Sequence, residues 1–167
     1  MQNSLVIMGV AGCGKSSVGQ AVAADLGWIL IEGDEFHGAD NLAKMSRGIA
    51  LTDADRATWL AMLAAQLQVR PQGAVLTCSA LKRAYRDRLR AAAPGLGFVF
   101  LQIDRELALA RVAARGSHFF SPALVDSQFA ALEDPSGEAR VLRLDASASI
   151  DSLRGAVAAW LRTEEAA

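Results

Sequence analysis

Residues 5–20 read LVIMGVAGCGKSSVGQ, and this stretch decides the fold of the chain. A short apolar run, Leu5 to Met8, leads directly into a segment with three glycines, a lysine and two serines. Apolar runs that end at glycine are typical of buried parallel strands. Apolar residues recur at helical spacing after the glycines, up to Leu26, and Gly27 follows as a natural helix end. The stretch therefore predicts a strand, an anion-binding loop and a helix.

The glycine segment matches the phosphate-binding P-loop pattern Gly-x-x-x-x-Gly-Lys-Ser in full. Glycine lets the backbone turn tightly and approach a phosphate, and the helix N-terminus that follows favours negative charge. We expect Lys15 to reach the terminal phosphates of a nucleoside triphosphate and the Ser16 hydroxyl to bind Mg²⁺. The predicted nucleotide-binding residues are Gly9, Val10, Ala11, Gly12, Cys13, Gly14, Lys15, Ser16 and Ser17.

The composition excludes several classes of protein. The chain has 167 residues, which suffice for one compact domain, and its net charge of −1 gives no sign of nucleic-acid binding. The apolar runs are too short to cross a membrane and no secretory signal is apparent, so we expect a cytoplasmic protein. Cys13 and Cys78 form no C-x-x-C pair, which favours reduced thiols. Cys13 is either a reactive thiol at a helix N-terminus or a small packed loop residue.

Strands and helical stretches alternate along the whole chain. After the first strand, the pattern predicts strands at 28–31, 74–77, 98–103 and 141–144. Further helices are expected after the capping box Thr52–Asp55, in a basic run ending at Arg90, and at 105–115 and 150–162. Residues 35–51 are polar and show little periodicity. This alternation predicts an α/β fold, a parallel sheet covered on both faces, with a binding crevice at the carboxyl ends of its strands.

A P-loop does not by itself name a reaction. The chain lacks the Asn-Lys-x-Asp motif expected of a GTPase, and a mechanical ATPase usually carries a strand ending in an acidic pair. Here two strands end in a single aspartate, Asp104 or Asp145. Asp104 either caps the following helix or binds a metal. Asp34 follows the second strand, at the edge where the crevice should open, and a loop position there favours a functional role.

Five blocks of sequence together resemble the gluconate kinases, a family of small P-loop kinases. They are GVAGCGKSS (9–17), GDEFHGADNLAKMSRGIALTDADRATWL (33–60), CSALKRAYRDRLR (78–90), GSHFF (116–120) and QFAALEDP (128–135). Gly38 and Ala50 stand where the family usually has proline, which changes loop stiffness more than chemistry. The resemblance implies ATP- and Mg²⁺-dependent phosphorylation of D-gluconate to 6-phospho-D-gluconate.

The resemblance also implies an architecture. It is a three-layer P-loop NTPase fold with five parallel strands in the order 2-3-1-4-5, formed by residues 1–167 as one kinase domain. A mobile lid is expected at about 112–135. The family suggests a homodimer, although no apolar pattern marks an interface. We expect D-gluconate as the partner, and neither nucleic acid nor membrane.

The acceptor would be a polyol with a carboxylate, which calls for hydrogen-bonding groups and a cation. We expect Asp34 to accept or orient the proton of the attacking hydroxyl, and to hold the metal through water. The predicted substrate-binding residues are Asp34, His37, Asn41, Arg47, Lys82, Arg83, Arg86 and His118. Arginine binds carboxylates in a planar fork, although the basic run is also what a solvated helix face presents.

Two arginines lie four residues apart on one predicted helix face, just before the expected lid. In related small kinases the lid brings arginines to the transferring phosphate, so Arg115, and after it Arg111, are predicted to stabilise charge there. His118 is expected to contact phosphate or substrate. Trp28, Trp59 and Trp160 are assigned to packing.

Two alternatives stay open on the sequence alone. A kinase of the same fold could act on another small hydroxy acid such as shikimate. A non-catalytic nucleotide-binding module would bind ATP without acceptor-dependent release of ADP.

Overall fold

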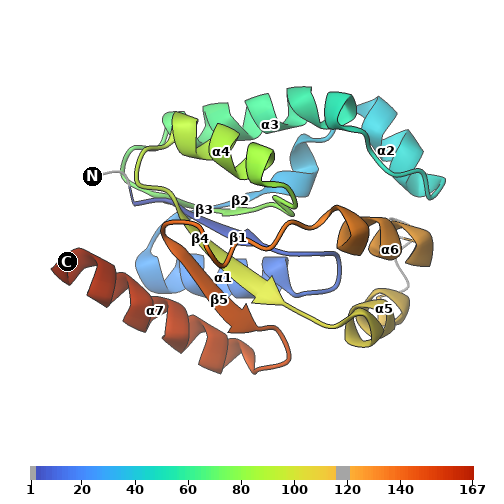
Figure 1. The fold of residues 1–167 in the computed structure, drawn as a ribbon. Coiled ribbons are helices and arrows are strands. Elements are labelled where there is room, and N and C mark those ends of the chain that lie inside the picture. The colour runs from blue at the N-terminus through green and yellow to red at the C-terminus, as the bar shows by residue number, and fades with distance from the viewer. Residues whose placement is uncertain (1–2, 116–120) are drawn as a thin grey trace.

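The computed structural model describes residues 3–115 and 121–167, in which strands and helices alternate (Figure 1). The strands are β1 (Leu5–Met8), β2 (Ile29–Glu32), β3 (Ala74–Thr77), β4 (Gly97–Gln102) and β5 (Val141–Asp145). The helices are α1 (Lys15–Leu26), the 3₁₀ turn η1 (Gly33–Phe36), α2 (Ala39–Ser46), α3 (Asp53–Gln68), α4 (Arg83–Ala92), α5 (Arg105–Ala114), α6 (Pro122–Ala131) and α7 (Ile150–Ala166).

The five strands form one parallel sheet in the order β2-β3-β1-β4-β5, which confirms the predicted topology. β1 is the central strand: Leu5 pairs with Val75 of β3 on one side and with Gly97 of β4 on the other. Because all strands run the same way, their carboxyl ends meet at one edge of the sheet. The phosphate loop, η1 and the segment after β3 all start at this edge.

Alternate residues of β1 divide the core into two halves. Leu5 and Ile7 pack with α1 and α7, whereas Val6 and Met8 pack with α3 and α4. All four β1 side chains are fully buried. The period of two along the strand thus produces the three layers seen in Figure 1, with α3 and α4 above the sheet and α1 and α7 below it.

The polar segment 35–51 is more ordered than its sequence indicates. It contains the short helix α2, whose buried residues are Asn41 and Met45. Its sequence shows little periodicity because an eight-residue helix with a polar outer face gives too few apolar positions for a clear period. The capping box is confirmed: the side chains of Thr52 and Asp55 each accept a hydrogen bond from the other's backbone amide.

Within the two described ranges, none of the helices is long and apolar enough to cross a membrane.

Asp104 accepts a hydrogen bond of 2.9 Å from the amide of Leu107 and so caps α5, the simpler of its two predicted roles. Cys13 and Cys78 are both buried free thiols. Cys13 is part of the apolar core beneath the phosphate loop.

Candidate active site

The phosphate loop connects β1 to α1, and its glycines fix its path. Gly12 and Gly14 have φ angles of 84° and 96°, a backbone conformation that favours glycine. A Cβ atom at Gly12 would lie 2.7 Å from the carbonyl oxygen of Ala108, so the loop passes too close to α5 for any other residue. Gly14 is the N-cap of α1 and has no side chain to cover the first amides of the helix. Those amides are left to bind an anion.

Lys15 lies over this loop. Its Nζ donates hydrogen bonds to the carbonyl oxygens of Gly9 at 3.0 Å and Val10 at 3.2 Å. Of the predicted nucleotide-binding residues, five also line a cavity at the sheet edge, whereas Gly9, Val10, Cys13 and Ser17 complete the loop without lining that cavity. The five are Ala11, Gly12, Gly14, Lys15 and Ser16.

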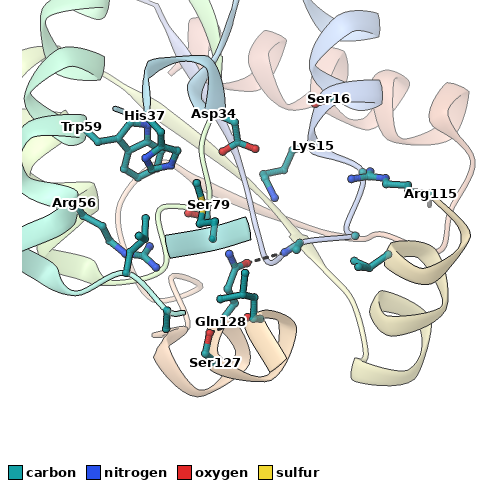
Figure 2. A pocket seen from close by; sticks show the side chains of 18 residues that line it. Lys15, Ser16, Asp34, His37, Arg56, Trp59, Ser79, Arg115, Ser127 and Gln128 are labelled. Carbon is teal, nitrogen blue, oxygen red and sulfur yellow. Dashed lines mark hydrogen bonds between the residues drawn. The ribbon is translucent and has the colours of Figure 1, made fainter. Parts of the chain in front are cut away.

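The cavity has a volume of about 310 Å³ and lies between the phosphate loop, η1, α3 and α6 (Figure 2). Lys15, Asp34 and His37 all point into it from the phosphate-loop and η1 side. Arg56 and Trp59 enter from α3, and Ser127 and Gln128 from α6. A volume of this size, with polar side chains converging on it from several elements, is typical of small-molecule sites.

Asp34 is held at the cavity by contacts to its neighbour Gly33. The amide of Gly33 donates to Thr77 Oγ1 at 3.3 Å, and the indole nitrogen of Trp59 donates to the Gly33 carbonyl oxygen at 2.8 Å. A Cβ at Gly33 would lie 2.2 Å from the Thr77 carbonyl oxygen, so glycine alone fits this approach of β2 to β3. The backbone is therefore fixed on both sides while the Asp34 carboxylate stays exposed in the cavity.

His37 is positioned by Asn41 and Trp59. Its ring stacks on the Trp59 ring at a centroid distance of 4.3 Å, so Trp59 shapes the site as well as packing in the core. Asn41 Nδ2 lies 3.2 Å from His37 Nδ1 and donates to the Asp55 carbonyl oxygen at 3.0 Å. Because the second bond fixes Nδ2 as a donor, Nδ1 accepts and Nε2 carries the proton of the neutral ring.

Burial lowers the pKa of His37 below its ordinary value, against the opposing charge of Asp34 and with a smaller contribution from Arg56. The neutral ring is therefore favoured at pH 7. Asn41 is itself buried and does not line the cavity. Its amide nitrogen contacts His37 and Asp55, so the structure shows it supporting His37, and its substrate contact stays a prediction.

Arg56 is the buried cation of the cavity, and the sequence analysis missed it. The residue is 9% exposed and its guanidinium lies 5.5 Å from the centre of the Tyr85 ring. Its Nε is buried without a hydrogen-bond partner among the described residues. A buried guanidinium with unused donors at a cavity wall fits an anionic ligand such as a carboxylate.

The basic residues predicted to bind the carboxylate do not line the cavity. Lys82 forms an ion pair with Asp53 at 3.0 Å, and Arg83 is exposed beside Asp87 at 3.6 Å. Arg47 is also exposed, and its Nε donates to the Ala43 carbonyl oxygen at 3.3 Å within its own helix. The structure therefore does not bring these three side chains together with the cavity residues, and their substrate contacts stay predictions.

Arg86 is fully buried and forms a structural ion pair. Its guanidinium contacts both oxygens of Glu138, at 2.7 Å for the shortest, and donates to the carbonyl oxygens of Ala80, Leu81 and Glu133. Burial raises the pKa of Glu138, but hydrogen bonds from Arg86 and Arg90 outweigh this and hold it below the ordinary value. The predicted carboxylate ligand of Arg86 is thus a carboxylate of the protein itself.

The two lid arginines differ in position. Arg115 is exposed and lines the cavity. Arg111 does not line it; its guanidinium donates to the carbonyl oxygens of Gly12, Cys13 and Ala146, at 2.9 Å for Ala146. The structure thus shows Arg111 supporting the phosphate loop, and its contact with the transferring phosphate stays a prediction. His118 lies outside the described residues.

Glu32, at the end of β2, is a further residue that the sequence analysis left without a role. Its Oε2 accepts hydrogen bonds from Ser16 Oγ at 3.0 Å and from Thr77 Oγ1 at 2.7 Å. Among the described residues, no group of three or more His, Cys, Asp or Glu side chains could hold a metal alone. The oxygen donors Ser16, Glu32 and Asp34 nevertheless fit Mg²⁺, which normally takes one or two protein groups and completes its shell with phosphates and water.

Known proteins resemble this chain in both sequence and fold. A family model described as an AAA domain matches residues 5–135. The thermosensitive gluconokinase of Escherichia coli (strain K12) is 42% identical over 146 residues, which cover 85% of this chain and 78% of that protein. The gluconokinase of Gluconobacter oxydans (strain 621H) is 44% identical over 143 residues, or 84% of this chain and 80% of that protein. A crystal structure of a gluconokinase from Sinorhizobium meliloti 1021, 45% identical, superposes with a TM-score of 0.89 and covers 98% of this chain and 94% of that one.

Proposed function

The chain belongs to the gluconokinase family, and from that premise we propose how its cavity transfers a phosphoryl group from ATP to D-gluconate. The products are ADP and 6-phospho-D-gluconate. The observation that carries the mechanism is the common cavity: Lys15 over the phosphate loop, the Asp34 carboxylate and the buried Arg56 guanidinium all line it. These three residues would serve as the phosphate-binding cation, the proton acceptor and the carboxylate-binding cation.

The loop from Gly9 to Ser17 binds the triphosphate. Its free amides and the N-terminus of α1 favour the negative charge, and Lys15 neutralises the terminal phosphates. Ser16, Glu32 and Asp34 would hold a magnesium ion, which when bound supplies further neutralisation of the phosphates. Arg111 supports the loop by donating hydrogen bonds to the carbonyl oxygens of Gly12 and Cys13.

The acceptor lies between the loop and α3. Arg56 binds the gluconate carboxylate, and the Nε2–H group of His37 and the Ser79 hydroxyl hold substrate hydroxyls. This arrangement orients the sugar acid so that its terminal hydroxyl faces the phosphate loop. Orientation of two bound reactants is a main source of catalysis in phosphoryl transfer.

In the chemical step the hydroxyl oxygen of gluconate forms a bond to the terminal phosphorus of ATP, and the bond from phosphorus to the bridging oxygen of ADP breaks. Asp34 takes the proton of the attacking hydroxyl and releases it to solvent, since its carboxylate is exposed. Arg115 stabilises the negative charge on the transferring group. We further propose that residues 1–167 act as one kinase domain with a lid at about 112–135, and that the enzyme is a homodimer.

A coupled assay of ADP release tests the function. Purified protein with ATP and Mg²⁺ is supplied with D-gluconate, shikimate, glucose or no acceptor. We expect acceptor-dependent release with gluconate and background release with the other three. Faster turnover of shikimate would contradict the substrate assignment, and equal release in all four reactions would contradict the kinase itself.

A further inference from the structure

Gln128 of α6 makes a direct hydrogen bond to the phosphate loop. Its side chain is buried, with the residue 8% exposed. Its Oε1 accepts a bond of 2.8 Å from the backbone amide of Ala11, which lies 117 positions earlier in the chain. A buried side chain of α6 thus connects the phosphate loop to the helix on the opposite side of the cavity (Figure 2).

This bond fixes which way the Gln128 amide faces. Rotating the amide group by half a turn would place its NH₂ group against the N–H of Ala11, and two donors cannot bond to each other. Oε1 must therefore face the loop, and Nε2 faces the cavity (Figure 2). Nε2 forms no hydrogen bond to any residue in 3–115 or 121–167.

An amide NH₂ group in such a place is matched to an oxygen acceptor on a ligand. Because Gln128 lines the cavity, a ligand oxygen there can accept this hydrogen bond. The Gln128 side chain is anchored to Ala11 of the phosphate loop. We therefore expect its NH₂ group near the terminal phosphate of bound ATP rather than near the carboxylate of gluconate. In phosphoryl transfer, charge spreads over the peripheral oxygens of the group that moves.

We propose that Gln128 donates a hydrogen bond from Nε2 to the phosphoryl group in transfer, while Oε1 keeps it anchored to Ala11. The inference rests on the proposed function, since it takes ATP as the phosphate donor. A neutral donor suits this position because Lys15 already supplies positive charge there. Its orientation is set before the reaction begins, and fixed donors of this kind contribute strongly to catalysis.

Two substitutions separate the donor role from the anchoring role. Gln128→Glu keeps an acceptor for the Ala11 amide but replaces the NH₂ donor by an anionic oxygen. Gln128→Met is similar in length and removes both. We expect both variants to lose roughly 100-fold in kcat, the scale for an oriented donor to a developing charge. Only Gln128→Met should also lower Tm, because it leaves the buried Ala11 amide unpaired.

Calorimetric binding gives a readout besides turnover. ADP should bind wild type and Gln128→Glu within about threefold, whereas β,γ-imido-ATP, which carries the third phosphate, should bind the variant at least about tenfold more weakly. Gln68→Glu is the matched control: it makes the same charge change at the exposed end of α3, away from the cavity, and should leave kcat and both affinities unchanged.

The outcomes are distinguishable. Wild-type protein that fails to phosphorylate gluconate contradicts the proposed function, whatever the variants do. If wild type is active and Gln128→Glu retains its kcat and its affinity for β,γ-imido-ATP, Gln128 only supports the loop and the inference is wrong. It is also wrong if Gln128→Glu weakens gluconate binding to the ADP complex and leaves β,γ-imido-ATP binding unchanged, because the amide would then face the acceptor.

Discussion

Arg86 and Arg56 are both buried arginines, but they lie in opposite environments. Arg86 is fully buried, and its guanidinium is surrounded by Glu138 and three backbone carbonyl oxygens. Arg56 is 9% exposed, lines the cavity, and makes no side-chain hydrogen bond to any described residue. The difference shows that the burial of a cation does not define its role. The donors of Arg86 are used within the protein, whereas Arg56 has a donor without a hydrogen bond and lines a cavity, which suits a ligand.

The first test of this comparison removes the satisfied arginine. Arg86→Met should lower the free energy of unfolding by about 3–5 kcal/mol, because it breaks a buried ion pair and leaves the Ala80, Leu81 and Glu133 carbonyl groups without this donor. Urea denaturation measures the change. Arg88→Met, on the exposed face of the same helix, serves as the control and should stay within about 0.5 kcal/mol of wild type.

If Arg86→Met left the free energy of unfolding unchanged and raised the KM for gluconate, the roles assigned to the two arginines would be wrong. Arg86 would then be the substrate ligand that the sequence analysis predicted, and its contact with Glu138 would be dispensable.

The second test concerns the carboxylate of the cavity. Asp34→Asn should lower kcat by roughly 100-fold or more, the usual scale for a positioned proton acceptor, and leave ADP affinity unchanged. Stability should not change, because this side chain is exposed and only its backbone is held by the fold. Steady-state kinetics and calorimetry measure the two quantities.

Glu35→Gln is the neighbouring control, since Glu35 is exposed and does not line the cavity. Turnover of Asp34→Asn at the wild-type rate would remove Asp34 from the mechanism.

The third test removes the unsatisfied arginine. Arg56→Met should raise KM for gluconate by roughly 30-fold, since a hydrogen bond to a charged group contributes about 1.5–3 kcal/mol. The free energy of unfolding should stay the same or rise, because a buried guanidinium that lacks hydrogen-bond partners is itself unfavourable. The two variants should therefore differ in two quantities: the free energy of unfolding falls only for Arg86→Met, and KM for gluconate rises only for Arg56→Met.

Arg83→Met completes this test. Arg83 belongs to the basic run that the sequence analysis favoured, yet it is exposed and outside the cavity lining. Its KM for gluconate should equal that of wild type. If Arg83→Met raised KM and Arg56→Met did not, the carboxylate would bind at the N-terminus of α4 instead.

The sequence predicted the parts of this molecule that depend on neighbours in the chain. Strand, glycine loop and helix follow one another within residues 5–26, so β1, the phosphate loop and Lys15 were predictable from local pattern alone. Asp34 was predictable for a similar reason, because a parallel strand delivers the residues after it to the sheet edge.

The two arginines were not predictable, because their environments come from distant parts of the chain. Arg86 meets Glu138, which lies 52 residues away, and no spacing rule connects them. Arg56 stands in the sequence Asp-Ala-Asp-Arg and resembles one more surface charge. It faces the cavity because Trp59, on the same helix, is bound to the Gly33 carbonyl and so fixes which face of α3 turns inward.

The fourth test extends the comparison to an arginine that lines the cavity but is exposed. Arg115→Ala should lower kcat for gluconate by roughly tenfold, about 1.4 kcal/mol, and change KM less. The effect is smaller than for Arg56 because an exposed guanidinium is solvated without its ligand and gains only where charge builds on the transferring group. Arg111→Ala provides the contrast: Arg111 is bonded to Gly12 and Cys13, so its loss should raise KM for ATP and lower Tm. If Arg115→Ala raised only the KM for gluconate, Arg115 would be a second substrate ligand. Guanidinium donors that make no hydrogen bond within the protein would then indicate substrate binding for an exposed arginine as well as for the buried Arg56.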